Sequence, residues 1–479
     1  MRINKQYKAL AFDFDGTLFD TAALNFKAYR LAYFDLGVEI TEEMFAKTKG
    51  LSVYDFNRAM GVDCDVEELR RLKQGYYRAM SVYARPNRYL LGMIRTATIP
   101  VALVTTARLQ NIWPLLEKYN LTKSFAAIIA QDNVSKHKPD PEAYNLAIQK
   151  LGIDPEDALA FEDSRAGFVA ARSAGLDCVQ IRDFSDRCIV DMTGGSESRT
   201  ELLYSSKENS LFVKKSSVNE EPTQRLWNQC HFLMMMDGCD GYVPVLNKAF
   251  TETRGSYTMP YIIGPNLYEY QNKIGVLEEV IYKLVRADLR DYNPNMRNNV
   301  DVVADCFKMY IEPGLRIYRM AGGKQSLPGG SMESMLQKID QNTDIINDFR
   351  LTRYHGDSTF ENIIMARGDG ATFIDPVPDG NVIQGIVHDF AKLGQSLYGY
   401  EAIRDGRAVD YAVERQIFQD MVHRHLIESE FRALKFHIAC LYLRRLKHQI
   451  KQNPALVVPY GDVAIQLLWE FVNGNYDIA

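Results

Sequence analysis

The stretch Phe12–Leu18, which reads Phe-Asp-Phe-Asp-Gly-Thr-Leu, constrains the fold of the first half of this chain more than any other. The residues before it, Leu10–Phe12, are apolar enough for a buried parallel strand, and Gly16 ends the run and lets the backbone approach a ligand. Asp13 and Asp15 are therefore predicted at the carboxyl end of a strand, where open α/β sheets bind ligands. With Mg²⁺ to hold a phosphate, one carboxylate can attack phosphorus while its neighbour moves the proton. An Asp-Gly turn that merely follows a strand is the alternative.

Two later strands in the first half also end in polar residues. The short apolar run 100–104 delivers Thr105 and Thr106, whose hydroxyls can bind a phosphate oxygen, and a Thr that caps the following helix is the alternative. The run 158–161 is a further strand that ends in Glu162-Asp163, and adjacent carboxylates are typical ligands of hard cations. We expect these strand ends to meet at one edge of the sheet.

Lys138 is followed by Pro139 and, two positions later, by Pro141. A cation held by two prolines is placed stiffly, which suits charge neutralisation at an attacking carboxylate and a phosphoryl group, although most lysines are simply solvated. Between the first two strands, residues from about 22 to 95 carry apolar side chains near helical spacing without a strong strand pattern, which predicts a helical insertion.

The order Asp-x-Asp-Gly-Thr, strand-Thr, Lys-Pro and Glu-Asp resembles the haloacid dehalogenase superfamily of phosphatases, in the branch of phosphoglycolate phosphatase and β-phosphoglucomutase. The resemblance implies a Rossmann-like parallel sheet in residues 1–186, with a helical cap at about 20–95. An Asp two residues after the nucleophile favours phosphate-ester hydrolysis or phosphomutase chemistry, because a leaving alkoxide needs a proton. The implied roles are a nucleophile at Asp13, an acid/base at Asp15, phosphate contacts from Thr105, Thr106 and Lys138, and Mg²⁺ ligands at Asp13, Glu162, Asp163 and the backbone carbonyl of Asp15.

The whole chain of 479 residues predicts two to four domains at about 100 to 200 residues each. A net charge of −5 argues against a nucleic-acid partner. The seven scattered Cys residues form no C-x-x-C pair, which predicts reduced thiols in a cytoplasmic protein. The sequence shows no signal-peptide pattern, and we expect no membrane span. The oligomeric state is not encoded in any of these features.

A second pattern of catalytic residues lies far downstream. His355 and Asp357 form a His-x-Asp pair, Asn362 follows after four residues, and the strand-like run 372–374 delivers Asp375. Phosphoryl transfer from ATP requires this set, because one carboxylate orients a hydroxyl while an amide and a second carboxylate hold Mg²⁺. Further upstream, a glycine-rich loop precedes two predicted antiparallel strands that contain residues 202–204 and 211–215, and such a loop can cover nucleotide phosphates.

This second pattern resembles the aminoglycoside phosphotransferase and choline kinase group. The resemblance implies a two-lobed, protein-kinase-like α+β domain in residues 187–479, with a small lobe at about 187–265 and a large lobe at about 266–479. One departure is Gln229, which occupies the slot of the helix glutamate that pairs with the strand lysine, unless Glu220 or Glu221 serves instead. The implied roles are a catalytic base at Asp357, Mg²⁺ ligands at Asn362 and Asp375, nucleotide contacts from Gly194, Gly195, Ser196, Lys214, Lys215, Met259 and Tyr261, and a brace for the catalytic loop at Asp389.

Together these features predict a cytoplasmic bifunctional enzyme, a Mg²⁺-dependent phosphatase fused to a small-molecule kinase that uses Mg²⁺ and ATP or another nucleoside triphosphate. Opposite activities at one position would only hydrolyse ATP, so we expect them to act at different positions of a sugar or polyol phosphate, as in precursor synthesis for capsule or surface glycans. One alternative is a phosphatase regulated by a nucleotide-sensing, non-catalytic kinase-like domain. Another is a resistance kinase of the aminoglycoside type that carries an inert N-terminal domain.

Overall fold

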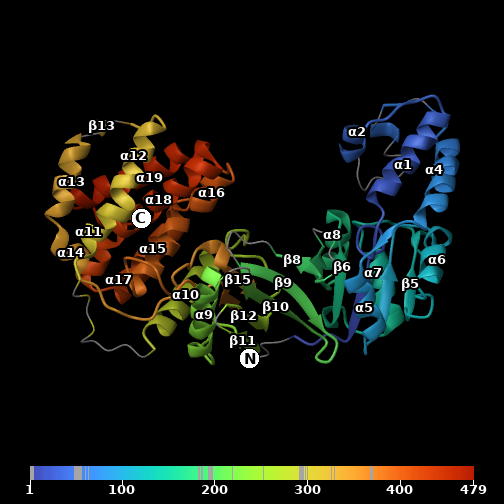
Figure 1. Ribbon diagram of the computed structural model, residues 1–479, viewed down its shortest axis with the longest axis horizontal. Coiled ribbons are helices and arrows are strands. Elements are labelled where there is room, and N and C mark those ends of the chain that lie inside the picture. The colour runs from blue at the N-terminus through green and yellow to red at the C-terminus, as the bar shows by residue number, and fades with distance from the viewer. Residues whose placement is uncertain are drawn as a thin grey trace. The chain divides into compact units, whose positions relative to one another are not determined.

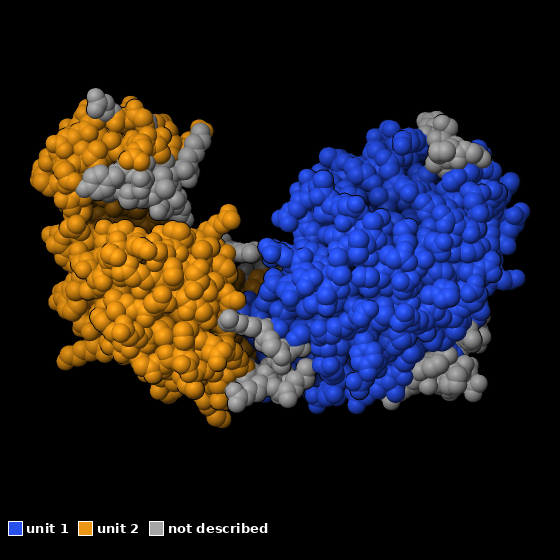
Figure 2. Space-filling model, turned by 180° about the vertical axis from the view of Figure 1, so that it is seen from behind, with its two compact units in different colours: residues 1, 217–479 blue, residues 2–216 orange. Residues whose placement is uncertain are grey.

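The computed structural model describes residues 5–47, 57–59, 61–62, 64–181, 184, 187–192, 198–217, 220–251, 253–290, 296, 298, 300–324, 326–327, 330–366 and 370–479. The chain divides into two compact units, residues 2–216 and residues 217–479, which Figure 2 colours separately. The division falls within a strand of the second sheet described below, whereas the predicted boundary lies before that sheet, at 186.

A five-stranded parallel sheet forms the centre of the N-terminal unit (Figure 1). Its order is β5-β4-β1-β6-β7, so the chain starts in the middle, extends to one side and then to the other. Every residue of β1, β4 and β6 is buried, which explains why these strands are apolar except for Glu162 at the end of β6. The strands are β1 Ala9–Phe12, β4 Val101–Val104, β5 Ala127–Ile129, β6 Ala158–Glu162 and β7 Asp177–Gln180.

Helices between these strands complete a Rossmann-like α/β fold, as predicted. One of these helices begins directly after Ser164, whose hydroxyl accepts a hydrogen bond from the backbone N–H of Gly167 (3.0 Å) and so caps the helix. Gly175 follows that helix with φ of +90°, a conformation that glycine adopts without strain. The helices are α5 Arg88–Thr96, α6 Leu109–Lys118, α7 Glu142–Leu151 and α8 Arg165–Ser173, with short 3₁₀ turns η1 Gln131–Asn133 and η2 Pro155–Asp157.

The predicted helical insertion is confirmed as α1 Ala22–Asp35, α2 Glu42–Lys47 and α4 Val66–Ser81, which lie together in Figure 1. These helices have a small core of their own, which includes the buried Tyr29, Tyr33 and Leu69. The insertion leaves and rejoins the sheet through two antiparallel segments, β2 Phe19–Asp20 and β3 Arg85–Pro86. The cap helices α1, α2 and α4 lie between β2 and β3. Helix α5 follows β3 and leads into β4, so it lies outside the cap.

A second five-stranded sheet has the order β11-β12-β10-β9-β8. The two strands predicted to contain residues 202–204 and 211–215 are confirmed as β9 and β10, and a turn at residues 206–209 joins them. Within the N-terminal unit, the Asn209 carbonyl of the turn accepts a hydrogen bond from the Tyr7 backbone N–H (2.9 Å). The strands are β8 Val190–Asp191, β9 Ser198–Ser205, β10 Ser210–Ser217, β11 Asn247–Phe250 and β12 Gly255–Pro260.

The rest of the C-terminal unit is helical with short antiparallel hairpins (Figure 1). Its helices are α9 Glu220–Met235, α10 Ile274–Asp288, α11 Val302–Cys306, α12 Glu312–Met320, α13 Met332–Asp340, α14 Thr343–Asn347, α15 Ile386–Leu397, α16 Tyr400–Arg404, α17 Ala412–His425, α18 Glu428–Gln452 and α19 Val457–Val472. The remaining elements are a π-helical turn η3 Phe307–Ile311, the 3₁₀ turns η4 Phe360–Asn362 and η5 Pro454–Leu456, and the strands β13 Ser326–Leu327, β14 Gly330–Ser331, β15 Ile363–Ala366 and β16 Gly370–Phe373.

One described segment, Pro454–Val472, is long and apolar enough to cross a membrane, although the sequence predicts no span. Half of that segment is buried inside the protein, and α19 packs along α18. The core helix of a soluble protein meets the same criteria of length and composition, so the segment is weak evidence for a membrane span.

Candidate active sites

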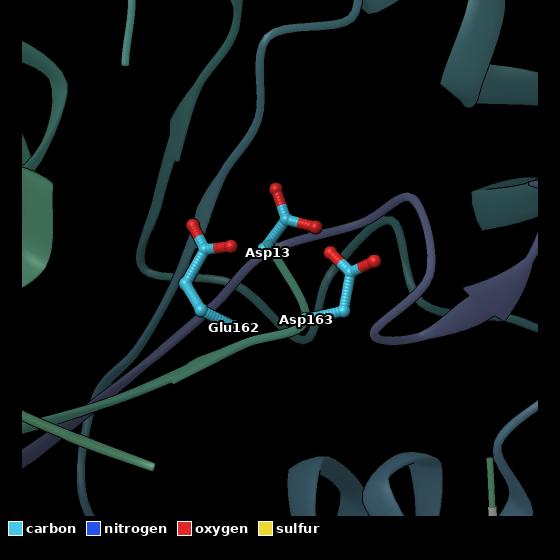
Figure 3. Close-up of side chains that lie close together, drawn as sticks. All are labelled: Asp13, Glu162 and Asp163. Carbon is cyan, nitrogen blue, oxygen red and sulfur yellow. The ribbon is translucent and has the colours of Figure 1, made fainter. Parts of the chain in front are cut away.

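Three carboxylates meet at the carboxyl ends of β1 and β6 (Figure 3). Asp13 directly follows β1, Glu162 is the last residue of β6, and Asp163 comes next. Because Phe12 and Phe161 are partners in neighbouring parallel strands, the residues after them emerge side by side. One carboxylate oxygen from each of the three lies within 4.8 Å of the other two. The structure thus brings together three of the predicted metal ligands.

Lys138 reaches this cluster from the loop between β5 and α7. Its ammonium group donates to Oδ1 of Asp13 (2.8 Å), to Oε1 of Glu162 (2.5 Å) and to the carbonyl of Val104 (2.9 Å). The Tyr144 hydroxyl donates to the same Glu162 oxygen at 2.7 Å. No sequence pattern predicts a role for Tyr144, since it belongs to the apolar face of α7.

The charge of this cluster fits a divalent cation. Three carboxylates against one ammonium leave two negative charges on groups that are largely buried. Burial and then the Glu162 carboxylate raise the pKa of Asp13 well above its usual value, against the opposing effect of Lys138. The Lys138 pKa is raised, because Asp13 and Glu162 outweigh its burial. Asp13, Glu162 and Asp163 would therefore hold Mg²⁺, which prefers oxygen ligands and supplies charge stabilisation to a bound phosphate.

Two glycines leave the space that the carboxylates occupy. Gly16 has φ of +83°, and a Cβ there would lie 2.2 Å from Oδ2 of Asp163. A Cβ on Gly167, in the first turn of α8, would lie 2.0 Å from the Glu162 carboxyl group. The sequence predicts that Gly16 lets the backbone approach a ligand. In the structure, the group that lies close to Gly16 is the side chain of Asp163.

The cap reaches the predicted acid/base. Oδ1 of Asp15 accepts hydrogen bonds from the Tyr77 hydroxyl of α4 (2.6 Å) and from the Thr21 hydroxyl (2.7 Å). The Lys73 ammonium, one turn before Tyr77, lies 5.0 Å from the ring centroids of both Tyr29 and Tyr77. Burial lowers the pKa of Lys73 to about 8, although the nearby Asp15 opposes this shift. These cap residues could not be identified from sequence, because spacing along α4 does not reveal which face meets Asp15.

The two predicted phosphate-binding threonines differ in their surroundings. Thr105 is buried, and its hydroxyl accepts a hydrogen bond from the backbone N–H of Ala107 (3.0 Å), whereas Thr106 is exposed. Helix α6 begins only at Leu109. The Thr105 hydroxyl therefore stabilises the turn after β4, before the helix.

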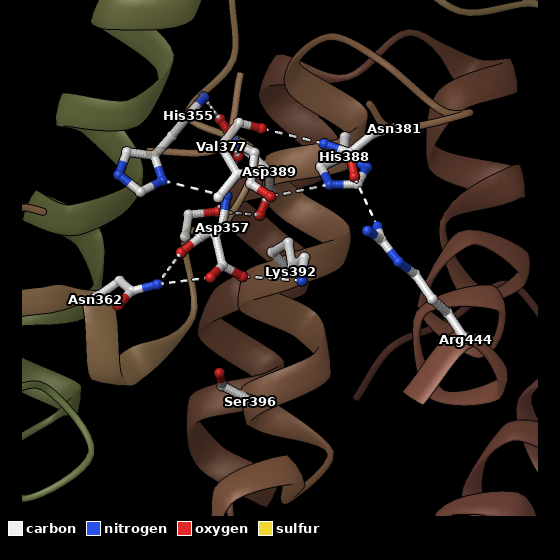
Figure 4. Close-up of polar contacts among 12 residues, drawn as sticks. His355, Asp357, Asn362, Val377, Asn381, His388, Asp389, Lys392, Ser396 and Arg444 are labelled. Carbon is white, nitrogen blue, oxygen red and sulfur yellow. Dashed lines mark hydrogen bonds and ion pairs between the residues drawn. The ribbon is translucent and has the colours of Figure 1, made fainter. Parts of the chain in front are cut away.

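The predicted catalytic residues of the C-terminal unit form a second centre (Figure 4). The Asn362 amide donates to Oδ2 (2.9 Å) and to the backbone carbonyl (2.8 Å) of Asp357, and the Lys392 ammonium lies 2.9 Å from Oδ1 of Asp357. Although burial acts against it, Lys392 lowers the pKa of Asp357 below its usual value. Asp357 is therefore ionised and fixed at neutral pH.

Asp389, which begins the predicted bracing segment, holds the backbone of this catalytic loop (Figure 4). Its carboxylate accepts hydrogen bonds from the backbone N–H groups of His355 (2.5 Å) and Gly356 (2.7 Å), and the Ser358 hydroxyl lies 3.1 Å away. Asp375 has φ of +58°, which is strained for a residue other than glycine and is frequent at functional sites. The Ile374 N–H donates to the Asn362 carbonyl (2.9 Å), which places Asn362 and Asp375 at the same end of the β15–β16 hairpin.

The predicted nucleotide contacts are only partly described. Lys214 and Lys215 lie on β10, and Lys215 is buried on the same face as Val213 whereas Lys214 is half-buried. Met259 is buried on β12, and Tyr261 follows that strand. Gly194, Gly195 and Ser196 lie outside the described residues. Gln229 is buried on α9, and α9 does include Glu220 and Glu221 at its start.

Comparison with known proteins identifies relatives of the N-terminal unit. Residues 10–181 match the model of the family described as haloacid dehalogenase-like hydrolase. A phosphorylated carbohydrates phosphatase of Thermotoga maritima is 31% identical over 178 residues, which cover 36% of this chain and 82% of the relative. Fructose-1-phosphate phosphatase YqaB of Escherichia coli is 29% identical, over 37% of this chain and 98% of the relative.

Among solved structures, CbbY from Rhodobacter sphaeroides in complex with phosphate is 27% identical, covers 40% of this chain and 90% of that chain, and has a TM-score of 0.34. The carboxylate cluster, the parallel sheet and the cap all lie in the matched part of the sequence. Through this N-terminal part, the chain belongs to the haloacid dehalogenase-like hydrolases.

Proposed function

We propose that the N-terminal unit is a Mg²⁺-dependent phosphatase that acts on a sugar or polyol phosphate through an aspartyl-phosphate intermediate. The observation that carries this proposal is the contact of Lys138 with both Asp13 and Glu162 beside Asp163. Asp13 would attack phosphorus, Asp15 would move the proton to the leaving oxygen, and Lys138 would offset the charge that develops. Bound Mg²⁺ would position the phosphate and lower its negative charge.

The relatives support the substrate class. The matched proteins include phosphatases whose names specify phosphorylated carbohydrates and fructose 1-phosphate. The substrate contacts from the cap would come from the α4 face that carries Lys73 and Tyr77, because that face meets Asp15. A lysine ammonium beside an acid/base suits an anionic sugar phosphate.

For the C-terminal unit we propose a protein-kinase-like fold and ATP-dependent transfer to a hydroxyl of a sugar or polyol. Asp357 is ionised and fixed by Asn362 and Lys392, which suits a base that orients an acceptor hydroxyl. Asn362 and Asp375 lie at one end of a hairpin, where they would hold a second Mg²⁺. Lys215 on β10 is the better candidate for the nucleotide phosphates, because it shares the buried face of that strand.

The fusion makes sense if the two activities act at different positions of one molecule in the cytoplasm. A kinase would add a phosphate at one hydroxyl, and the phosphatase would remove another. The product would be a singly phosphorylated sugar or polyol ready for nucleotidyl transfer, as needed for capsule or surface-glycan precursors.

One observation favours a second candidate, a nucleotide sensor that regulates the phosphatase. Gln229 is buried on α9 in the slot of the family glutamate, and an amide cannot neutralise a lysine.

The test uses the Asp13→Asn protein, so that the phosphatase cannot remove what the kinase adds. We would incubate it with Mg-ATP and a panel of sugars, polyols and their phosphates, and detect products by mass spectrometry. We expect one acceptor to gain one phosphoryl group, and the same reaction to fail in Asp13→Asn/Asp357→Asn. The wild-type enzyme should then remove a phosphate at a different position of that product. ATP binding with no mass gain in any acceptor would favour the sensor.

A further inference from the structure

An open cavity lies beside the catalytic loop of the C-terminal unit, and neither proposed activity uses it. Its volume is about 610 Å³, which is in the range of small-molecule sites. One wall is the face of α9 that carries His231, Phe232 and Met235. The opposite wall is the segment 351–354, which leads directly into His355. Asp357, Asn362 and Asp375 do not line the cavity, so it is separate from the proposed transfer site.

Most of the cavity surface is apolar, but one buried acid lines it. Asp288, the last residue of α10, is 1% exposed. Within the described part of the chain, no amide, hydroxyl, ammonium or guanidinium group donates a hydrogen bond to either oxygen of Asp288. A buried carboxyl group without such donors is costly, since each unmet acceptor loses its hydration without compensation. The neighbouring acid, Asp379 at the cavity wall, already accepts a hydrogen bond from Asn228 at 2.5 Å.

Asp288 also lies near the brace of the catalytic loop. Burial and then the nearby carboxylate of Asp389 raise the pKa of Asp288 well above its usual value, which favours the protonated form of Asp288. Burial likewise raises the pKa of Asp389 to about 6. Asp389 in turn holds the N–H groups of His355 and Gly356 (Figure 4). A group that binds Asp288 therefore acts on the loop through one intervening side chain.

We propose that this cavity binds a small organic amine whose ammonium group docks on Asp288 and whose apolar body lies against Phe232, Met235 and Tyr354. The ammonium replaces the proton of the Asp288 carboxyl group, and that proton leaves to the solvent. The positive charge near Asp389 then favours its carboxylate form, which accepts the hydrogen bonds of the loop amides. The binding site stands on the cavity alone, and only its effect on transfer rests on the proposed kinase function.

The test compares three probes of similar size with the full-length protein, by ligand-observed NMR. The probes are 2-phenylethylamine, its neutral analogue 2-phenylethanol and the anion 3-phenylpropionate. We expect the amine to bind roughly tenfold or more tightly than the alcohol, because a charge-assisted hydrogen bond is lost with the ammonium. Equal binding of amine and alcohol, or binding of the anion as tightly as the amine, would overturn the proposal.

Variants locate the bound amine. Asp288→Asn should abolish the preference for the amine, whereas Asp305→Asn, the same change at an exposed acid of α11, should keep it. Met235→Trp narrows the cavity without changing its acid, and should weaken the binding of both amine and alcohol; it tests the site even if Asp288→Asn does not fold. An unchanged amine preference in folded Asp288→Asn, or unchanged binding in Met235→Trp, would place the amine elsewhere.

A readout independent of transfer separates this site from the proposed kinase. Amide hydrogen exchange of residues 355–358 should slow when 2-phenylethylamine is bound to the wild-type protein, and not in Asp288→Asn. If exchange slows but no acceptor is ever phosphorylated, the kinase proposal fails and the site stands. If an acceptor is phosphorylated but the amine changes neither exchange nor transfer, the link between the cavity and the loop is wrong and the kinase proposal stands.

Discussion

The two candidate centres of this chain hold their main carboxylate in opposite ways. At the N-terminal centre, Asp13 is crowded by Glu162 and Asp163, and burial with the Glu162 charge raises its pKa. At the C-terminal centre, Asp357 stands alone between a lysine and an amide, and Lys392 lowers its pKa although burial acts against it. Burial and the neighbouring carboxylates therefore oppose the ionised form of Asp13, whereas Lys392 favours the ionised form of Asp357.

The two centres therefore depend on the charges around them in different ways. A cluster with two surplus negative charges stores electrostatic repulsion that a metal relieves, so folding, metal binding and activity are linked there. A carboxylate that is already neutralised by a lysine contributes to a fixed loop geometry instead. Four predictions test the comparison.

The largest expected effect is the reciprocal loss of the two activities. Asp13→Asn should lower phosphate release by about 10⁴-fold, since the nucleophile is removed, and leave ATP-dependent transfer within about twofold. Asp357→Asn should do the reverse. Phosphate release and product mass would be measured on the same preparations. A single substitution that abolishes both activities would show that the two centres do not work independently.

Removing Lys138 should destabilise the N-terminal unit. Lys138→Met leaves the buried carboxylates of Asp13 and Glu162 without their cation, and loss of one partner of a buried ion pair costs about 3–5 kcal/mol. Lys136→Met is the matched control, since the exposed Lys136 makes only a surface ion pair and its loss should cost less than about 1 kcal/mol. Urea-dependent hydrogen exchange of β1 and β6 would measure both variants. Mg²⁺ should increase stability in the wild-type protein more than in Asp163→Asn.

Stability of the C-terminal unit should fall in acid because of buried histidines. Burial lowers the pKa of His437 to about 3, and its ring nitrogens have no hydrogen-bond partner in the described residues. The unfolded chain then binds one more proton than the folded protein between about pH 6.5 and pH 3. The stabilisation is complete above pH 6.5 and decreases as the pH falls, by about 2 kcal/mol at pH 5.

His437→Leu should therefore reduce the loss of stability between pH 8 and pH 5, as measured by urea unfolding. The control is His423→Gln, which changes an exposed histidine of α17. His355 and His388, whose pKa values burial lowers to about 4 and about 3, should keep part of the acid sensitivity. A pH profile in His437→Leu identical to that of the wild-type protein would contradict the assignment.

The smallest effect concerns the cap. With burial holding the Lys73 pKa at about 8, the ammonium that faces Asp15 is lost above that pH. We expect kcat/KM for p-nitrophenyl phosphate to decrease about tenfold per pH unit above pH 8, and Lys73→Met to remove this decrease while lowering the plateau. Lys27→Met, at an exposed lysine of α1, should leave the profile unchanged. The same alkaline decrease in Lys73→Met would exclude this lysine.

Sequence reasoning located the sheet and the carboxylate cluster, because apolar runs that end in acids specify strand ends, and parallel strand ends converge. The same reasoning found Asp357 and Asn362, whose spacing along one loop is sufficient to bring them together. Tyr77, Tyr144 and Lys73 could not be found, since each reaches its site across tertiary contacts from a helix with an ordinary pattern. The cavity beside Asp288 could not be predicted for the same reason, because its walls include α9 and the segment 351–354, which lie more than a hundred residues apart.

Gly16 and Gly167 limit the substitutions that this sequence can accept during evolution. Neither has a side chain that could react, yet an alanine at either position would place a methyl group on a carboxylate of the cluster. We expect substitutions at these two positions to be purged as strictly as those at Asp163 and Glu162 themselves. In sequences that descend from this one, we expect glycine to be kept at positions 16 and 167 wherever Asp163 and Glu162 are kept.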